Sequence, residues 1–384
     1  MGGQSMEQPT NAHIIHSQTS SGVQPGAATP GMHMQREISE QPGALAGLIA
    51  SARAVFDGLA QPARRCAFAM LAARGSSDNA STYGKYVLEG VCGLPTALAA
   101  PSLFTLYHTP PRLKDALVIG VSQSGAAADV IAVLDEGRKQ GALTLAITNT
   151  AGSPMTRAAG HVLLLGVGPE QALAATKTVT AQCAAYALLA GAMSADHTLD
   201  AQVHALPGVV QTIIRAERQI AAMAQTYAQA QAMWVIGRGY AYSAAEEIAL
   251  KLKETCFIYA EAFSAADFLH GPLATVDEGD DMLVLLSEDE TLPTTIEFTH
   301  RVLTRGARVL MIASGQTVMH ATVAAIVKGQ FADNIRVLTL PDMPPLISNI
   351  GFIVAGQLFA LHLSLAKRHN PDVSRGVTKV TVTR

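Results

Sequence analysis

Residues 116–140 read ALVIGVSQSGAAADVIAVLDEGRKQ, and this stretch decides the fold of the chain. A continuous apolar run, Ala116–Val121, ends in a loop rich in Ser and Gly, and a segment of helical length, Ala126–Gln140, follows. A short strand without polar alternation suits a parallel sheet that helices cover on both faces. The stretch therefore predicts one strand–loop–helix unit of a doubly wound α/β fold.

The same pattern occurs in both halves of the chain. Three apolar runs recur at an offset of about 165 residues, which indicates an internal duplication. Phe68–Ala73 corresponds to Met233–Ile236, Ala116–Val121 to Met282–Leu286, and Ala142–Ile147 to Ala307–Ile312. We therefore predict two doubly wound parallel-sheet α/β domains in tandem, residues 60–200 and 208–365.

Further segments flank the two predicted domains. Residues 1–34 are polar and aperiodic, so we predict a mobile N-terminal extension. Residues 36–59 are predicted to form an N-terminal helix and residues 366–384 a C-terminal tail. The end of that tail, Thr378–Val382, alternates like an edge strand.

The composition limits the classes of function. The 384 residues include 27 Lys and Arg against 30 Asp and Glu, so no basic surplus is available to neutralise nucleic-acid phosphates. Only 15% of the residues are charged, whereas roughly 25% is usual in soluble domains. A chain so poor in charge is expected to bury further surface in an oligomer.

Hydropathy and cysteine content indicate a cytoplasmic protein. The longest apolar stretches, Gln182–Met193 and Gly351–Ala366, do not give the roughly 20 clean apolar residues that a membrane span needs, so we predict buried helices and no membrane association. The four cysteines lie far apart without a C-x-x-C pair, so neither structural zinc nor a disulfide framework is expected.

Two Ser-rich loops follow strands in the first predicted domain. The loop SQSG at 122–125 precedes a helix, so hydroxyls, an amide and free helix N–H groups converge there, which suits a phosphate monoester. The loop GSSD at 75–78 follows the preceding strand in the same way. Either loop could instead be a simple helix N-cap. Two such loops at adjacent strand ends favour a ligand site, because ligands of this fold bind there.

The second half carries a different set of polar residues. Glu247, Lys251 and Glu254 are spaced by four and three residues, which places them on one face of a helix. Such a stripe is usually a solvated ion-pair face, but the shortage of charge elsewhere and the preceding Gly-Arg-Gly loop favour a functional cluster. His270, beside a predicted turn, is by itself more typical of a surface or packed histidine, and Lys379 alone indicates nothing.

Five motifs occur in a fixed order along the chain. They are SQSG at 122–125, ATK at 175–177, ALKLKE at 249–254, HGPLA at 270–274 and KVTV at 379–382. With them, residues 36–384 resemble the tandem sugar-isomerase (SIS) family, which includes the isomerase half of glutamine–fructose-6-phosphate aminotransferase. The motifs ARGSSD at 73–78, GPE at 168–170 and LKETC at 252–256 are similar to the SIS-type glucosamine-6-phosphate deaminases. The resemblance implies two flavodoxin-like SIS domains.

The resemblance also implies roles for individual residues. The sugar phosphate would contact Ser76, Ser77, Ser122, Gln123, Ser124, Gly125, Ala175, Thr176 and Lys251. Glu254 would move a proton between C1 and C2, His270 would assist ring opening from its own or the partner subunit, and Lys379 would close over the site. Glu247 would order the charged helix. No metal and no cofactor is implied, and the partners are a small sugar phosphate and a second copy of the chain in a homodimer.

The sequence departs from the aminotransferase pattern in several places. Ala127 removes a hydroxyl expected at the phosphate, Ala175 replaces a Ser, and no glutaminase domain with a terminal Cys nucleophile is expected.

The expected function is conversion of glucosamine 6-phosphate to fructose 6-phosphate plus ammonia. One alternative is an isomerase or deglycase acting on another amino-sugar or fructosamine phosphate. An alternative of a different class is a non-catalytic sugar-phosphate-binding regulatory protein.

Overall fold

The computed structural model describes residues 29–194 and 197–376. In the first half, the strands are Phe68–Ala72 (β1), Thr96–Leu98 (β2), Ala116–Ser122 (β3), Leu143–Thr148 (β4) and His161–Leu164 (β5). The helices there are Met32–Ser39 (α1), Gln41–Ala63 (α2), Ser76–Cys92 (α3), Ser102–Thr105 (α4), Ala128–Lys139 (α5), Pro154–Ala158 (α6) and Lys177–Ser194 (α7).

The second half repeats this alternation. Its strands are Ala232–Gly237 (β6), Tyr259–Ser264 (β7), Asp281–Leu286 (β8), Arg308–Ser314 (β9) and Ile335–Leu340 (β10). Its α-helices are His197–Arg215 (α8), Glu217–Gln225 (α9), Tyr242–Lys251 (α10), Ala265–Phe268 (α11), Leu292–Thr304 (α12), Gly315–Met319 (α13), Ala321–Lys328 (α14) and Pro345–Ala366 (α15). Gly239–Ala241 (η1) and Pro272–Thr275 (η3) are 3₁₀ turns, and Leu252–Cys256 (η2) is a π turn.

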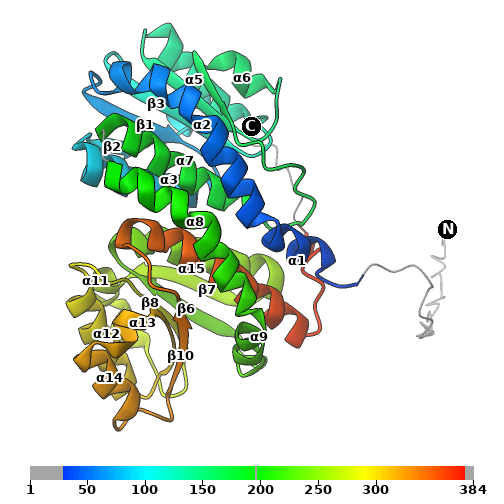
Figure 1. The fold of residues 1–384 in the computed structure, drawn as a ribbon, viewed down its shortest axis with the longest axis vertical. Helices are drawn as coiled ribbons and strands as arrows, with labels where there is room; N and C mark the ends of the chain where they lie inside the picture. The colour runs from blue at the N-terminus through cyan, green and yellow to red at the C-terminus, as the bar shows by residue number, and fades with distance from the viewer. Residues whose placement is uncertain (1–28, 195–196, 377–384) are drawn as a thin grey trace, which may run out of the picture.

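Two five-stranded parallel sheets form the core of the described chain, stacked along its long axis (Figure 1). The strand orders are β2-β1-β3-β4-β5 and β10-β9-β8-β6-β7. Read from the first strand of each half, both orders are that of a flavodoxin-like sheet, with the switch in direction between β1 and β3 or between β6 and β8. The predicted fold class of two doubly wound α/β units in tandem is confirmed.

Packing explains why residues 116–140 form a central strand and a helix. All seven residues of β3 are buried, as a parallel strand covered on both faces requires. Gly120 in this strand allows α5 to approach, because a Cβ there would lie 2.6 Å from Leu134 Cδ1. The helix starts at Ala128 rather than at the predicted Ala126, since Ala127 is extended and Gly125 is left-handed.

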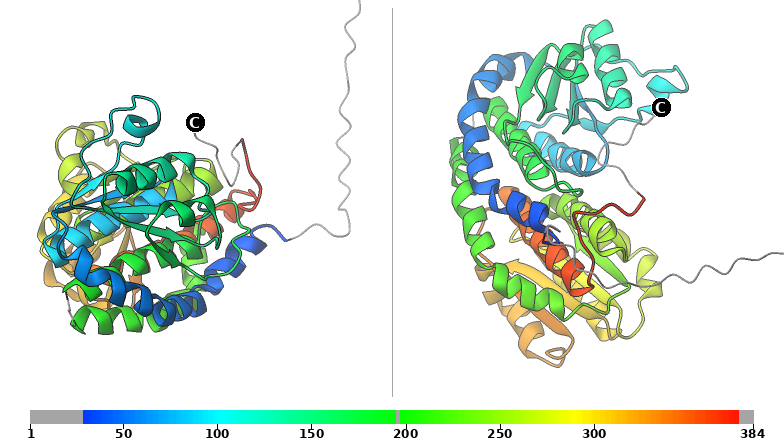
Figure 2. Two further views of the ribbon diagram at one scale, coloured as in Figure 1. Left: turned by 90° about the horizontal axis from the view of Figure 1, so that it is seen from above. Right: turned by 90° about the vertical axis from the view of Figure 1, so that its right-hand side faces the viewer.

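Helix α15 lies in the middle of the molecule between the two halves (Figure 2). By length and composition, α2 and α15 could each cross a membrane, but 89% of the apolar window of α15 is buried within the protein. The buried Gln357 side chain accepts a hydrogen bond from Gln41 Nε2 and donates to the Thr176 carbonyl. A buried, hydrogen-bonded Gln fits the core helix predicted from the sequence.

Helix α1 begins inside the segment that the sequence indicated as a mobile extension. Residues 32–34 of that segment are helical, and Met34 is fully buried. The N–H groups of His33 and Met34 donate to the carboxylate of Asp372 from the other end of the chain. A distant carboxylate thus satisfies the free N–H groups of the first turn, a partner that no local pattern reveals. The rest of the predicted extension up to residue 28, the predicted edge strand and Lys379 lie outside the described residues.

Candidate active site

The loop Ser122–Gly125 leaves β3 at the topological switch point of the first sheet. The Gly125 N–H donates to Ser122 Oγ at 3.2 Å, and the Ala126 N–H donates to Ser124 Oγ at 3.3 Å. The carbonyl of Gln123 accepts the Asn149 N–H from the loop after β4. No side chain caps the start of α5 at Ala127, so the helix N-terminus keeps N–H groups for an anion.

Gly125 is fixed in this loop by its conformation and its neighbours. Its φ is +63°, and a Cβ there would lie 2.1 Å from Ser153 Oγ. Only Gly combines the left-handed backbone with such close approach at low cost.

We therefore expect Gly125→Ala to weaken sugar-phosphate binding by roughly tenfold or more, because a Cβ against Ser153 Oγ must shift the loop, in addition to the cost of the left-handed conformation for Ala. Isothermal titration with the sugar phosphate measures the effect. Gly141→Ala is the matched control, because Gly141 is also left-handed but has open space around its Cβ position. Equal loss of affinity in both variants would contradict the expectation.

The loop after β1 meets the second half of the chain. Ser76 Oγ accepts a hydrogen bond from Lys251 Nζ at 3.1 Å, and Lys251 Nζ also donates to Glu254 Oε2 at 2.6 Å. Glu247 Oε1 lies 3.2 Å from the same nitrogen, and Glu247 Oε2 accepts from Asn79 Nδ2. The structure thus brings three of the predicted residues of the second half against the Ser-rich loop of the first.

Burial decides between the two interpretations of the charged stripe. Glu247 and Lys251 side chains are each 1% exposed, whereas that of Glu254 is 28% exposed. The interpretation as a solvated ion-pair face is therefore wrong. Burial lowers the pKa of Lys251, but Glu247 and Glu254 raise it more, so the ammonium is retained. Burial also raises the pKa of Glu247, against the opposing effects of Lys251 and Asn79.

The backbone at Glu254 differs from the single α-helix that the spacing predicts. Helix α10 ends at Lys251, and Glu254 lies on the π turn η2. Single π turns inside helices occur frequently at functional sites. On this turn, Glu254 Oε2 lies 2.6 Å from Lys251 Nζ, and the Glu254 side chain remains partly open to solvent.

The remaining predicted site residues have contacts other than those of the Lys251 cluster. Ser77 Oγ accepts from Gln182 Nε2 at 3.0 Å. Thr176 is buried, and both its N–H and its hydroxyl donate to Glu170, while Ala175 beside it is partly exposed. His270 is exposed and makes no hydrogen bond or ion pair with another residue that the structure describes, apart from its backbone N–H to Asp267.

Four polar residues at this site were not predicted from the sequence: Arg74, Asn79, Asp129 and Gln182. Asn79 donates to Glu247, and Gln182 donates to Ser77. Arg74 Nε donates to Asp129 Oδ2 at 2.6 Å and thereby joins the loop after β1 to the first turn of α5. Asn79 follows Ser76 by three residues, so the two side chains lie on one face of the helix. This spacing in the sequence could have indicated Asn79 as a site residue. No motif in the sequence indicated Gln182 as a site residue, because it lies in a long apolar segment.

Among the described residues, the segment that follows β8 in the second half is not an equivalent anion site. By the repeat offset, the segment 288–290 after β8 corresponds to 123–125 after β3, and it reads Glu-Asp-Glu instead of Gln-Ser-Gly. Carboxylates at these positions repel a phosphate. The duplication therefore leaves one phosphate-binding candidate among the loops that follow strands in the described chain, at the carboxyl ends of β1 and β3.

Glu246, next to Glu247 on α10, is a titrating group between the two halves. Burial raises its pKa to about 7, helped by Asp78 and opposed by hydrogen bonds from Thr82 and Tyr242. Since the folded pKa lies above the ordinary value of 4.5, the protonated form stabilises the fold, and this stability is lost as the pH rises toward and through 7.

We expect the free energy of unfolding to fall by up to roughly 3 kcal/mol between pH 5 and 8 because of this group. Glu246→Gln should flatten that part of the profile. Chemical denaturation at several pH values measures both proteins, and Glu297→Gln, an exposed carboxylate on α12, serves as control. Parallel profiles for wild type and Glu246→Gln would refute the assignment.

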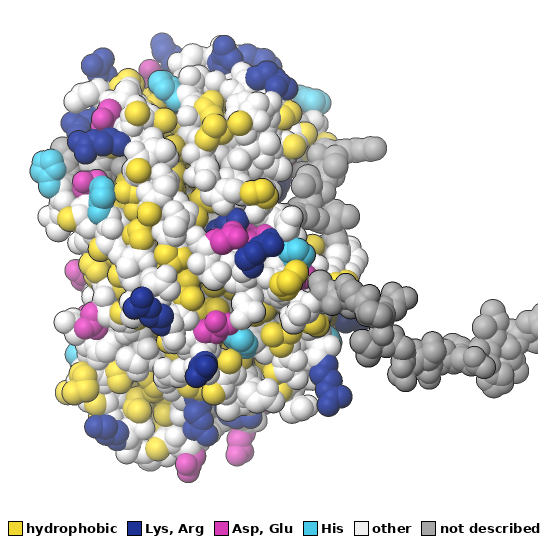
Figure 3. Space-filling model, turned by 45° about the vertical axis from the view of Figure 1, so that its right-hand side comes forward, with side chains coloured by type: hydrophobic (Ala, Val, Ile, Leu, Met, Phe, Trp, Pro, Cys, Tyr) yellow, Lys and Arg dark blue, Asp and Glu magenta, His cyan; other side chains and the backbone are white. Residues whose placement is uncertain are grey.

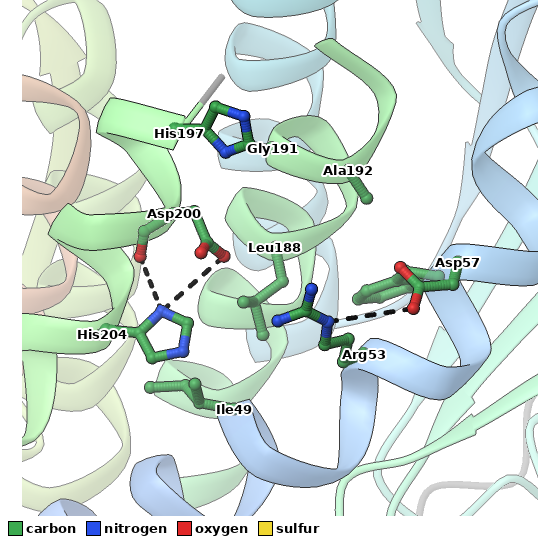
Figure 4. Close-up of a pocket in the computed structure, with 10 residues that line it drawn as sticks. Ile49, Arg53, Asp57, Leu188, Gly191, Ala192, His197, Asp200 and His204 are labelled. Carbon is green, nitrogen blue, oxygen red and sulfur yellow. Dashed lines mark hydrogen bonds and ion pairs between the residues drawn. The ribbon is translucent and has the colours of Figure 1, made fainter. Parts of the chain in front are cut away.

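A hollow lies apart from this site, between α2, α7 and α8 (Figure 4). His204 contacts Asp200, and Arg53 pairs with Asp57, each one helical turn apart. None of the predicted site residues lines it. Within residues 29–194 and 197–376, no group of three or more His, Cys, Asp or Glu is placed to hold a metal ion.

Comparison with known proteins connects this arrangement to a family. The SIS domain model matches residues 66–192 and 226–327. Glutamine–fructose-6-phosphate aminotransferase of Halobacterium salinarum is 36% identical over 328 residues, which are 81% of this chain and 51% of that protein. The enzyme of the same name from Methanothermobacter thermautotrophicus is 33% identical over 91% of this chain and 57% of its own length. The chain thus spans little more than half the length of these relatives.

Solved structures agree with this result. The C-terminal domain of glucosamine-fructose-6-phosphate aminotransferase from Francisella tularensis superposes with a TM-score of 0.80 at 25% identity, covering 89% of this chain and 98% of that domain. Glucosamine-6-phosphate deaminase from Thermotoga maritima superposes with a TM-score of 0.66 at 17% identity, covering 91% of this chain and all of that one, which shows a shared fold.

Proposed function

The chain belongs to the SIS domain family, and from this we propose that it is a phosphosugar isomerase that converts glucosamine 6-phosphate and water to fructose 6-phosphate and ammonia. One observation carries the proposal: Lys251 Nζ bridges Ser76 of the phosphate-loop side and Glu254 of the π turn, at 3.1 and 2.6 Å. Anion-binding groups and a partly open carboxylate are thereby held at one junction between the two halves.

In the proposed reaction, Glu254 transfers one proton from C2 to C1 of the sugar. In the open-chain sugar, the carboxylate takes the C2 proton and returns it to C1, so that the C1 aldehyde and C2 amine become a C1 alcohol and C2 imine. Water then adds to the imine carbon, and ammonia leaves to give the ketone. The Lys251 ammonium stabilises the negative charge of the intermediate, and its two carboxylate neighbours keep it charged.

In this proposal, the Ser-rich loops 75–78 and 122–125 of the first half bind the phosphate. Ser122 and Ser124 hydroxyls and the uncapped start of α5 offer donors for the phosphate oxygens. Arg74, half-exposed beside these loops, brings a guanidinium there, and its Nε is paired with the buried Asp129 carboxylate at 2.6 Å. Ala127 supplies no hydroxyl, so we propose that backbone N–H groups take a larger share of the binding.

We also propose a cytoplasmic homodimer with a shared site. His270 is exposed and makes no hydrogen bond or ion pair with Glu254 within one described chain, which supports the proposal that it serves the site of the partner. Large apolar side chains are exposed at Leu106, Tyr107 and Met319, and apolar side chains lie between scattered charges over the face in Figure 3. Singly exposed apolar residues are normal on a protein surface, so the dimer proposal rests on the low charge content of the chain and on the position of His270.

The direct experiment incubates the purified protein with glucosamine 6-phosphate and measures ammonia and fructose 6-phosphate. Equal amounts of both products support the proposal. Turnover of a different amino-sugar or fructosamine phosphate, without ammonia from glucosamine 6-phosphate, would limit the proposal to an isomerase or deglycase. Tight binding without turnover of any of these compounds would indicate a regulatory binding protein instead.

A further inference from the structure

A hollow of about 620 Å³, which we call the basic hollow, lies at the amino ends of β6 and β7. Its walls come from the segments 225–231, 256–257 and 366–375. Small-molecule sites in proteins usually have volumes of roughly 300–1,000 Å³. No residue of the candidate active site lines the basic hollow. Ligands of this fold usually bind at the opposite, carboxyl ends of the strands, so a molecule held here would be a second ligand.

The charged side chains that line the basic hollow are all basic. They are Lys367, Arg368 and Arg375, with His369 beside them, and no Asp or Glu lines it. Among the residues that the structure describes, none of these four side chains forms an ion pair with a carboxylate. The chain as a whole has 27 Lys and Arg against 30 Asp and Glu, so a general basic surplus does not explain this cluster. A bound anion would compensate its charge.

Backbone groups fix Lys367 at the wall of the basic hollow. Its Nζ donates to the carbonyls of Ala228 and Ala230 at 3.1 and 2.6 Å. An ammonium has three N–H donors, so one donor is left for a ligand. Asp281, a carboxylate on which the charge of Lys367 acts, is paired instead with Arg308 at 2.5 Å. Lys367 is therefore held in place without a carboxylate bound to it.

The guanidinium of Arg375 lies over an aromatic ring that lines the same hollow. Its carbon is 5.2 Å from the centroid of the Phe257 ring, and the ring of His369 packs edge-on against Phe257 at 5.0 Å. A cation–π contact engages the face of the ring and uses no hydrogen-bond acceptor. The N–H fork of Arg375 thus remains available, and such a fork matches the oxygens of a phosphoryl group.

Backbone conformation marks the basic hollow independently of its charge. Phe257 and Arg368 are left-handed, with φ of 54° and 62°. Only two other non-glycine residues of the described chain, His108 and Asp115, have a positive φ. Such conformations are unfavourable for residues with a Cβ and cluster at ligand clamps and active sites. Two of these four residues line one hollow, which supports a binding role for it.

We propose that the basic hollow is a second anion site, which binds a phosphorylated small molecule through Lys367, Arg368 and Arg375. Two guanidinium forks and one ammonium N–H would meet the phosphoryl oxygens. Phe257 directly follows the π turn that carries Glu254. A ligand in the basic hollow therefore contacts the end of that turn, although the proposed binding does not depend on the reaction assigned to Glu254.

The experiment measures binding of pyrophosphate to the full chain by isothermal titration calorimetry and locates it by amide hydrogen exchange. Arg368→Gln, Arg375→Gln and their double variant remove cations from the basic hollow. The matched control is the double variant Arg53→Gln with Arg301→Gln. It removes two solvent-accessible arginines outside the hollow, so it changes the net charge by the same amount.

We expect each single variant to weaken pyrophosphate binding roughly tenfold and the double variant roughly 100-fold, because a hydrogen bond to a charged group contributes about one factor of ten in affinity. In the wild type, pyrophosphate should slow exchange in residues 225–231, 252–257 and 366–376. The double variant should lose this protection, and the control variant should behave like wild type. Repeating the exchange measurement with glucosamine 6-phosphate and with adenosine diphosphate distinguishes a sugar phosphate from a nucleotide as the source of the phosphoryl group.

Two results would overturn the proposal. Equal affinity of the wild type and the double variant would show that pyrophosphate binds elsewhere, for example at the Ser-rich loops of the first half. An equal loss of affinity in the control variant would show a general effect of net charge. Neither measurement uses turnover, so failure of the proposed function and failure of this site are distinguishable.

Discussion

Glu254→Gln should lower kcat for the proposed reaction by roughly 10²–10⁴-fold, the usual contribution of a positioned general base. The amide keeps the size of the side chain and its contact with Lys251 Nζ, but it cannot accept the C2 proton. Binding should persist, because the phosphate loops of the first half are unchanged. Steady-state kinetics together with calorimetric titration of glucosamine 6-phosphate separate the two effects.

A control and a contrary outcome make this prediction specific. Glu261→Gln changes another carboxylate of the same region, but its side chain is 63% exposed and only loosely paired with Lys253. This variant should retain wild-type kcat. Full turnover by Glu254→Gln would remove Glu254 from the catalytic role, whereas loss of binding with loss of the fold, seen by circular dichroism, would show a structural role.

Lys251→Met should destabilise the protein by about 3–5 kcal/mol and abolish turnover, because removing one partner of a buried pair leaves an uncompensated charge. The carboxylate of Glu247 would remain 1% exposed without its cation. Chemical denaturation measures the stability. Lys253→Met, on the π turn that follows Lys251 but 44% exposed, should stay within about 0.5 kcal/mol of wild type.

A double variant tests the physical reason for this loss. Lys251→Met with Glu247→Gln removes both the cation and the charge that it compensates, so part of the lost stability should return. Turnover should not return, since the ammonium proposed to stabilise the intermediate is still missing. Additive destabilisation in the double variant would show that the two charges are not coupled and would contradict the buried ion-pair geometry.

The apolar pattern of the sequence was sufficient for the architecture. Runs such as Ala116–Val121 have no polar alternation, so only a sheet covered on both faces buries them, and their repetition predicts the second domain. The motifs also indicated the family. The sequence pattern did not show the π turn. A change of the backbone hydrogen bonds from i→i+4 to i→i+5 does not alter how far apart Glu247, Lys251 and Glu254 are in the sequence.

By itself, the sequence determined the central strands β1, β3 and β4 and their counterparts β6, β8 and β9, that the unit occurs twice, and which Ser-rich loops lie at strand ends. These properties follow from local periodicity, which each short segment carries within itself. Only the tertiary structure decided the state of the charges. It buried Lys251 between two carboxylates and Ser76, placed Asp372 at the start of α1, and left His270 exposed. Burial and electrostatic pairing depend on segments that are far apart in sequence, so no local pattern contains them.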